Sequence, residues 1–329
     1  MTGLQVGVGV ALPVAILLPH MVPLHRVTPA VAAVVWLCVL SLRALVAIGG
    51  ALFIFVYMPQ TGVYAAVADW CLHEVLPLIA AHLGLSGHPL VHAAIVVPGL
   101  ALAASVLWLL FGLTRAWLLV RAQLRRALGE GPHGSTIIED DGIVLAVTGL
   151  GRSRILISRA ALGAMDSDEL EASLSHELGH IHRRHRPLLL LSLVLVALGR
   201  MLPGTRTAER ELRFSFERDA DDYAVRRTRD PLALASAICK AASSRTPAGT
   251  TALTGSSRVA LRLDYLEGQA RRADPRLERG VRVLAAALVT LTLGLSATLP
   301  AWALAVPQEA PVLSAADSGC NHGKSQPQS

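Results

Sequence analysis

The sequence predicts a mostly α-helical membrane protein, with about four membrane-spanning helices and one polar α+β domain. Hydrophobic residues make up 53% of the 329 positions and charged residues 16%, whereas a soluble domain carries about 25% charged residues. The charge is also segregated, because positions 121–280 hold 25 of the 30 Lys and Arg residues. This pattern argues against a simple soluble enzyme, a disordered protein and a nucleic-acid-binding module. We therefore expect contact with the lipid bilayer and no direct contact with nucleic acid.

Four apolar stretches are candidates for the membrane-spanning helices: residues 4–18, 30–58, 91–113 and 283–306. A membrane helix needs about 20 apolar residues. The first stretch is short and contains Pro13. No basic residue precedes it and no small-residue cleavage site follows closely, so we interpret it as an uncleaved span. The predicted organisation is a three-helix transmembrane region at 1–120, a polar domain at 121–280, a fourth span at 281–306 and a disordered tail at 307–329.

The basic residues between these stretches predict the orientation, since Lys and Arg accumulate in cytoplasmic loops. The loop 59–90 contains no Lys or Arg, whereas Arg115, Arg121, Arg125 and Arg126 follow the third span. We therefore expect a multi-pass protein of the plasma membrane. Its polar domain should be cytoplasmic, and its N-terminus and C-terminal tail should lie outside.

Two apolar stretches need separate interpretation. Arg43 interrupts the second span, and an Arg at the centre of a bilayer costs roughly 2.5–3.5 kcal/mol on insertion scales. The favoured interpretation starts the crossing near Leu42 and lets Arg43 reach the inner surface; the alternative is a buried functional arginine. Residues 188–202 offer only 12 residues before Arg200, about 18 Å of helix against a core of about 30 Å. We predict that this segment does not cross.

Within the polar domain, residues 127–136 have the Gly, Pro and Ser content of a linker. Residues 142–148 and 154–158 flank a Gly-containing turn, which predicts a β-hairpin. A helix should begin after Asp166, because Glu169 stands at the position that completes a capping box. Pro187 should stop or kink that helix.

The predicted helix contains His176-Glu177-Leu178-Gly179-His180, an HExxH motif. Residues four apart lie on one helical face, so His176 and His180 can present imidazole nitrogens to one zinc ion. Glu177 is offset by about 100° and can act as general base on a water molecule. Chance would produce about 0.015 such motifs in a chain of this composition.

Two imidazoles leave zinc short of a third protein ligand. The extended HExxHxxGxxH pattern is excluded, because Arg183 and Arg186 stand where it needs Gly and His. His182 is displaced by about 200° from His180 around the helix, and His185 comes one residue early for the extended pattern. We interpret both histidines as surface residues.

A later segment, residues 207–227, is helical in composition and offers the missing ligand. It contains Glu217 and Asp221, four residues apart and therefore on one face. Glu217 can bind the zinc ion, and Asp221 can accept a hydrogen bond from the free nitrogen of a ligand histidine. We therefore expect one zinc ion per chain.

The sequences HELGH and ERDAD together resemble the glutamate-zincin membrane metallopeptidases, of the HtpX and CAAX-prenyl-protease type. Three spans before the zinc domain and one after it resemble the BlaR/MecR type. The resemblance implies a cytoplasmic zincin-type domain in which His176, His180 and Glu217 bind zinc. It also implies that Glu177 is the general base and that Asp221 orients a ligand. Residues 256–263 resemble an arginine-containing stretch of these families, to which we assign no role.

These features predict an integral-membrane zinc metalloendopeptidase that acts on a protein or peptide, such as a transcriptional repressor or a membrane protein. Tyr223, Arg226 and His185 are candidates for the group that stabilises the transition state. A signalling component would share this chemistry and differ only in its substrate. A non-catalytic membrane zinc sensor or scaffold is the alternative, although such a protein does not need Glu177. A transporter is not supported, because the sequence shows no internal repeat.

Overall fold

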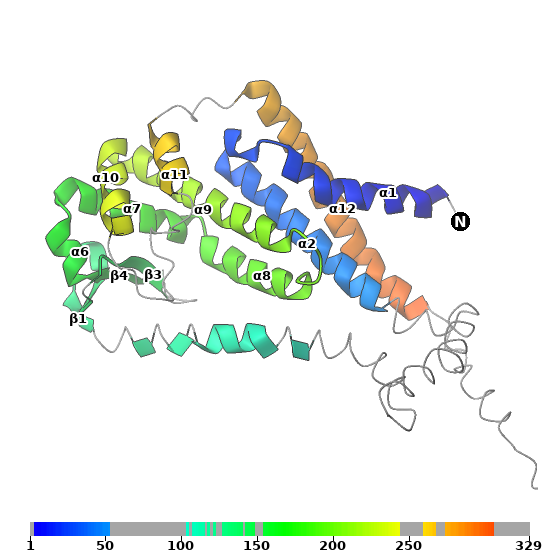
Figure 1. Cartoon of the computed structure of the whole chain (residues 1–329), viewed down its shortest axis with the longest axis horizontal. Coiled ribbons are helices and arrows are strands. Elements are labelled where there is room, and N and C mark those ends of the chain that lie inside the picture. The colour runs from blue at the N-terminus through cyan, green and yellow to red at the C-terminus, as the bar shows by residue number, and fades with distance from the viewer. Residues whose placement is uncertain are drawn as a thin grey trace, which may run out of the picture. The chain divides into compact units, whose positions relative to one another are not determined.

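A computed structural model describes residues 3–52, 103–104, 107–115, 117–118, 121–122, 127–140, 142–148, 154–243, 259–267 and 274–305. The chain divides into two compact units, of which the first comprises Met1–Ala44 and Val106–Thr292. The second comprises Leu45–Ser105 and Leu293–Ser329. The described residues are mostly helical, with one small mixed sheet in the first unit (Figure 1), which agrees with the predicted fold class. All the predicted site residues belong to this first unit.

The sheet has the strand order β1-β2-β4-β3. Its strands are β1 (Ala127–Glu130), β2 (Thr136–Ile138), β3 (Leu145–Thr148) and β4 (Arg154–Ser158). The predicted hairpin is confirmed, since β3 and β4 pair antiparallel with Leu145 opposite Ile157 and Thr148 opposite Arg154. β2 joins the other side of β4 in parallel. Among the described strands, β3 is therefore an edge strand with one side open.

The prediction of a linker at 127–136 was wrong. Most of this segment forms β1, the following turn and the start of β2, and the two strands pair antiparallel. Gly and Pro serve here as turn residues: Pro132 begins a 3-10 turn (Pro132–Gly134), and Gly134 adopts a φ of 71°, which favours glycine. The N–H of Gly131 donates to the carbonyl of Ser135 at 2.7 Å and closes the turn.

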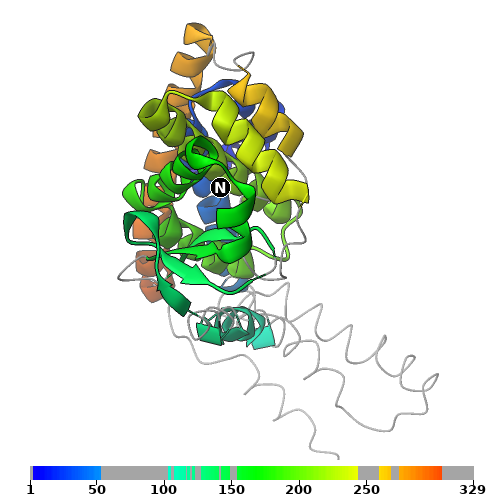
Figure 2. The same cartoon turned by 90° about the vertical axis from the view of Figure 1, so that its left-hand side faces the viewer.

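Successive side chains of the strands point alternately to the two faces of the sheet, and both faces are buried. One face packs against the helices in the main core, which contains Leu145, Val147, Ile155 and Ile157. The opposite face forms a small separate cluster of Ile138, Val144, Ala146 and Leu156. The turned view shows the strands beside the helices of the same unit (Figure 2). The edge strand β3 is thus held rigidly next to the helix that carries the HExxH motif.

After α6 (Arg159–Ala164) comes that helix, α7 (Ser167–His182). Its predicted start is confirmed: Asp166 accepts from the Glu169 N–H at 2.9 Å, and Glu169 Oε2 accepts from the Asp166 N–H at 2.9 Å. Glu169 also accepts from Ser236 Oγ at 2.5 Å and from Lys240 Nζ at 2.6 Å, both on α10 (Pro231–Ser243). The capping box therefore ties the start of α7 to α10.

α7 ends at His182, and α8 (His185–Leu198) begins after Arg184. Arg184 has φ 53° and ψ 39°, the left-handed region that is uncommon for residues other than glycine. Pro187 lies in the first turn of α8, a position that suits proline. The helix α9 (Thr205–Thr228) then runs back to the site, and α11 (Val259–Leu266) completes the domain. The segment predicted not to cross the membrane is therefore the 14-residue helix α8 and the turn that follows it.

Two helices are long and apolar enough to cross a membrane among the described residues: Pro29–Ala51 of α2 (Pro29–Leu52) and Pro275–Thr298 of α12 (Pro275–Ala305). They correspond to the second and fourth predicted spans. The first predicted span corresponds to the 19-residue helix α1 (Gly3–Met21). Most of the third span, the loop 59–90 and the tail lie outside the described residues. The count of four spans and their orientation stay predictions.

Arg43 differs from the favoured expectation. α2 is continuous from Pro29, and Arg43 is 2% exposed within it. Its guanidinium donates to the carbonyl of Pro203 and lies 3.1 Å from Nε2 of His20. The prediction that Arg43 reaches the surface was wrong, because the turn between α8 and α9 supplies a backbone acceptor next to α2.

Candidate metal centre

The metal-ligand candidates come from two packed helices, α7 and α9. His176 and His180 lie one turn apart on α7, and Glu217 faces them from α9. The helices approach closely at Gly179, where a Cβ atom would lie 3.2 Å from the Ala220 Cα and 3.1 Å from the Tyr223 Cβ. Gly179, the fourth residue of the HExxH motif, therefore permits the distance between helices that brings Glu217 to the histidines.

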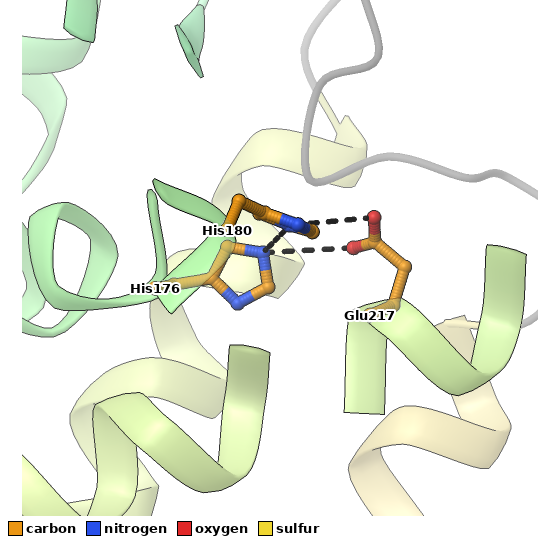
Figure 3. A group of neighbouring side chains, drawn as sticks. All are labelled: His176, His180 and Glu217. Atoms are coloured by element: carbon orange, nitrogen blue, oxygen red, sulfur yellow. Dashed lines mark hydrogen bonds and ion pairs between the residues drawn. The ribbon is translucent and has the colours of Figure 1, made fainter. Parts of the chain in front are cut away.

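Three side chains converge on one point (Figure 3). Nε2 of His180 lies 3.2 Å from Nε2 of His176. Each of these nitrogens lies 3.6 Å from one carboxylate oxygen of Glu217. One ligand atom from each residue lies within 4.8 Å of the others. The structure thus brings together the three residues that the sequence predicts as metal ligands.

Asp221 lies behind His176, as expected. Its Oδ1 is 2.9 Å from Nδ1 of His176, and its side chain is completely buried. The buried Arg262 of α11 binds the same carboxylate with two nitrogens, Nε to Oδ2 at 2.9 Å and Nη2 to Oδ1 at 2.6 Å. Its third nitrogen, Nη1, lies 3.1 Å from Glu217 Oε2. Arg262 therefore compensates two acidic groups at the site.

Glu177 lies next to the ligands and is held by the sheet. Its side chain is buried, and Oε2 accepts a hydrogen bond of 3.1 Å from the backbone N–H of Val147 on β3. Burial raises the pKa of Glu177 to about 7, and the charge of His176 and the Val147 N–H oppose that shift. A carboxyl group with a pKa near 7 can both accept and release a proton at neutral pH.

His180 has a second histidine behind it. Nδ1 of His180 lies 2.9 Å from Nδ1 of His185, and Nε2 of His185 lies 3.1 Å from Oδ2 of Asp219. His185 is 2% exposed and stacks on Phe216 at 4.6 Å. The expectation of a surface residue at 185 was wrong. His182, in contrast, is exposed as predicted.

The backbone break explains the difference. In one continuous helix, His185 would be rotated by about 140° from His180. The left-handed Arg184 ends α7 and returns the His185 ring to His180. Pro187 was the sequence signal, since proline in a first turn indicates that a new helix begins just before it.

The three residues predicted as candidates for transition-state stabilisation contact other groups instead of the point where the ligand atoms converge. His185 contacts the Nδ1 side of His180, opposite the nitrogen that faces His176 and Glu217. Tyr223 stacks on the exposed His182 at 5.5 Å, and Arg226 pairs with Asp222 at 3.3 Å. Arg262, among the described residues, has nitrogens within 3.1 Å of both Asp221 and Glu217. Sequence reasoning assigned it no role, because only the resemblance of residues 256–263 pointed to it.

The donor set fits zinc. Although burial lowers it, the carboxylates of Asp221 and Glu217 raise the pKa of His176 to about 9, so a metal ion would have to displace one proton. Asp221 can only accept a hydrogen bond, so the remaining proton would lie on Nδ1 and the lone pair of Nε2 would face the centre. The pKa of His180 is lowered to about 3, chiefly by burial, so this ring is neutral. Two nitrogens at 2.0–2.1 Å from a tetrahedral zinc ion are about 3.3 Å apart, close to the observed 3.2 Å. One carboxylate completes the set of three protein ligands found in catalytic zinc sites.

Comparison with protein families agrees with this geometry. Residues 130–245 match the model of peptidase family M48. This segment is similar to that family. The match bears out the resemblance to glutamate-zincin membrane metallopeptidases. No curated protein and no solved structure matches the chain.

The M48 segment covers the sheet from Glu130 onward and the helices α6–α10. It therefore contains all five predicted site residues: His176, Glu177, His180, Glu217 and Asp221. Arg262 and the two long apolar helices lie outside it.

Proposed function

We propose that the protein is an integral-membrane zinc metalloendopeptidase. The observation that carries the proposal is the convergence of His176, His180 and Glu217, from two helices, beside the buried carboxylate of Glu177. The M48 match supports the class of reaction. The three converging side chains would hold one zinc ion per chain. When bound, zinc would supply a Lewis acid for the peptide carbonyl and would make water more acidic.

Glu177 is the proposed general base. Glu177 is not part of the group of ligand atoms from His176, His180 and Glu217. Its carboxylate therefore remains available for proton transfer. It would take a proton from the attacking water molecule and later give it to the nitrogen of the leaving amine. The hydrogen bond from Val147 N–H fixes the direction of the carboxylate. An oriented and buried base needs little reorganisation during the reaction.

The open side of β3 is the proposed binding edge for the substrate. An extended peptide can add to a sheet edge by backbone hydrogen bonds. β3 pairs with β4 on one side only among the described strands, and its Val147 N–H already contacts Glu177. A peptide along this edge would therefore pass next to the base.

We further propose that the domain is cytoplasmic and that the protein spans the plasma membrane several times. Two long apolar helices and the distribution of Lys and Arg support this placement. A site of this kind would act on a cytoplasmic regulator, such as a transcriptional repressor, or on another membrane protein. Comparing the proteomes of cells with wild type and Glu177→Ala would reveal which protein fails to be cut.

The experiment that tests the proposal measures metal content and peptide-bond hydrolysis on the purified full chain, with casein as an unselective substrate. Wild type should hold about one zinc ion and cleave casein. Glu177→Gln should keep the zinc and lose cleavage. Near-wild-type cleavage by this variant would refute the role of Glu177 as base. Zinc binding by a wild-type protein that cleaves neither casein nor any cellular protein would favour the non-catalytic sensor.

The roles of Glu217 and Asp221 are separated by their alanine variants. Glu217→Ala should lose both zinc and activity, because it removes one of three ligands. Asp221→Ala should weaken zinc affinity or rate by roughly 10–100-fold, the usual effect of a residue that orients a ligand. Retained zinc in Glu217→Ala and complete loss in Asp221→Ala would reverse the assignment.

A further inference from the structure

A buried chain of three side chains runs from Asp219 to the metal centre. Asp219 lies 3.1 Å from Nε2 of His185, and Nδ1 of His185 lies 2.9 Å from Nδ1 of His180. Asp219 and His185 are 5% and 2% exposed. The sequence resemblance assigns neither residue a role. Neither is placed as a ligand, because His185 contacts the Nδ1 side of His180, away from Glu217, and Asp219 lies behind His185.

The chemistry of these groups determines where the protons lie. The carboxylate of Asp219 can only accept, so Nε2–H of His185 donates to it. With both rings neutral, Nδ1 of His185 then carries a lone pair and accepts from Nδ1–H of His180. Nε2 of His180 is left without a proton, and it is the nitrogen that lies 3.2 Å from Nε2 of His176.

We propose that Asp219 and His185 are positioning residues, which hold His180 in the tautomer and ring orientation that binds the metal. The inference rests on the proposed zinc site. It gives both histidine ligands an acidic anchor on α9: Asp221 reaches His176 directly, and Asp219 reaches His180 through His185. Hydrogen bonds of this kind fix tautomer and orientation, and their loss costs about 10–100-fold in metal affinity.

The backbone supports a dedicated role for His185. The left-handed Arg184 lies between the end of α7 and the start of α8. This break is what allows a residue five positions after His180 to return to it. Phe216 stacks on the His185 ring at 4.6 Å and an interplanar angle of 27°. The ring is therefore fixed from the side as well as at both nitrogens.

The test measures zinc affinity by chelator competition and the absorption spectrum of the cobalt-substituted full-length protein. His185→Phe keeps the ring shape and the stacking on Phe216 but removes the acceptor. It should bind zinc about 10–100-fold more weakly and should alter the cobalt spectrum. His185→Gln can still accept and donate, and it should recover most of the affinity. His182→Phe, at the exposed end of α7, is the matched control and should behave as wild type.

Asp219 provides a second, independent pair of variants. These variants test the positioning of His180 if His185→Phe does not fold. Asp219→Asn keeps an acceptor oxygen and should stay close to wild type, whereas Asp219→Leu should lose affinity. Thermal unfolding of the zinc-free variants separates this effect from a general loss of stability. Zinc affinity within twofold of wild type in folded His185→Phe or Asp219→Leu would overturn the inference. Failure of wild type itself to bind zinc would instead overturn the proposed function.

Discussion

Arg262 offers a quantitative test of the electrostatics at the site. It is 2% exposed, and it directs three nitrogens to the carboxylates of Asp221 and Glu217 at 2.6–3.1 Å. Arg262→Met keeps an unbranched side chain and removes the charge and the hydrogen-bond donors. Asp221 is completely buried, so the variant would leave its carboxylate in the interior with His176 as the remaining partner. Removing one partner of a buried ion pair costs about 3–5 kcal/mol.

A loss of this size is large enough to measure. A domain of 150–250 residues loses roughly 2–4 °C in Tm for each kcal/mol, so Arg262→Met should lower the Tm by roughly 6–20 °C. The assay is thermal unfolding of the zinc-depleted protein in detergent, followed by far-ultraviolet circular dichroism.

The matched control is Arg226→Met. The Arg226 side chain is 67% exposed and pairs with Asp222 at 3.3 Å along the same helix. An exposed pair of this spacing contributes about 0.3–0.5 kcal/mol, so the control should shift the Tm by no more than about 2 °C. Equal Tm values for Arg262→Met and Arg226→Met would refute the reasoning that Arg262 neutralises the acidic pair.

Three further predictions concern packing, acid stability and topology. Gly179→Val should push α9 away from α7, lower stability by about 1–3 kcal/mol and weaken zinc binding; unchanged zinc affinity would contradict the close-approach argument. Burial alone would raise the pKa of Glu169, but hydrogen bonds from Lys240 and its other partners hold it below the usual 4.5. Its contribution to stability is therefore complete above that pH and is lost as the pH falls through the lowered pKa. Glu169→Gln should consequently show a smaller drop in Tm on acidification than wild type, and an equal drop would count against this account. Single cysteines at Arg184 and Arg206, both exposed, should react with a membrane-impermeant reagent from the cytoplasmic side only. Labelling of one of them from outside and the other from inside would show that α8 crosses.

Much of the site could be predicted from the sequence because its geometry is local. The one-turn spacing of His176 and His180 follows from helix geometry alone, and so does the shared face of Glu217 and Asp221. The start of α7 could be predicted from Asp166 and Glu169, because a capping box involves two residues only three positions apart. The same holds for the hairpin, because β3 and β4 are neighbours in the sequence. It also holds for α2 and α12, because each is one continuous apolar segment.

The remaining features depend on contacts between distant parts of the chain. A single left-handed residue, Arg184, redirects His185 from the surface to the metal centre, and no periodicity argument can include such a break. Arg262 reaches Asp221 across 41 positions of sequence, and Arg43 reaches Pro203 across 160. A buried charge is stable only beside its partner, and the partner is brought there by packing of helices. Sequence by itself therefore determined which residues could bind a metal, whereas the tertiary structure decided which groups orient and neutralise them.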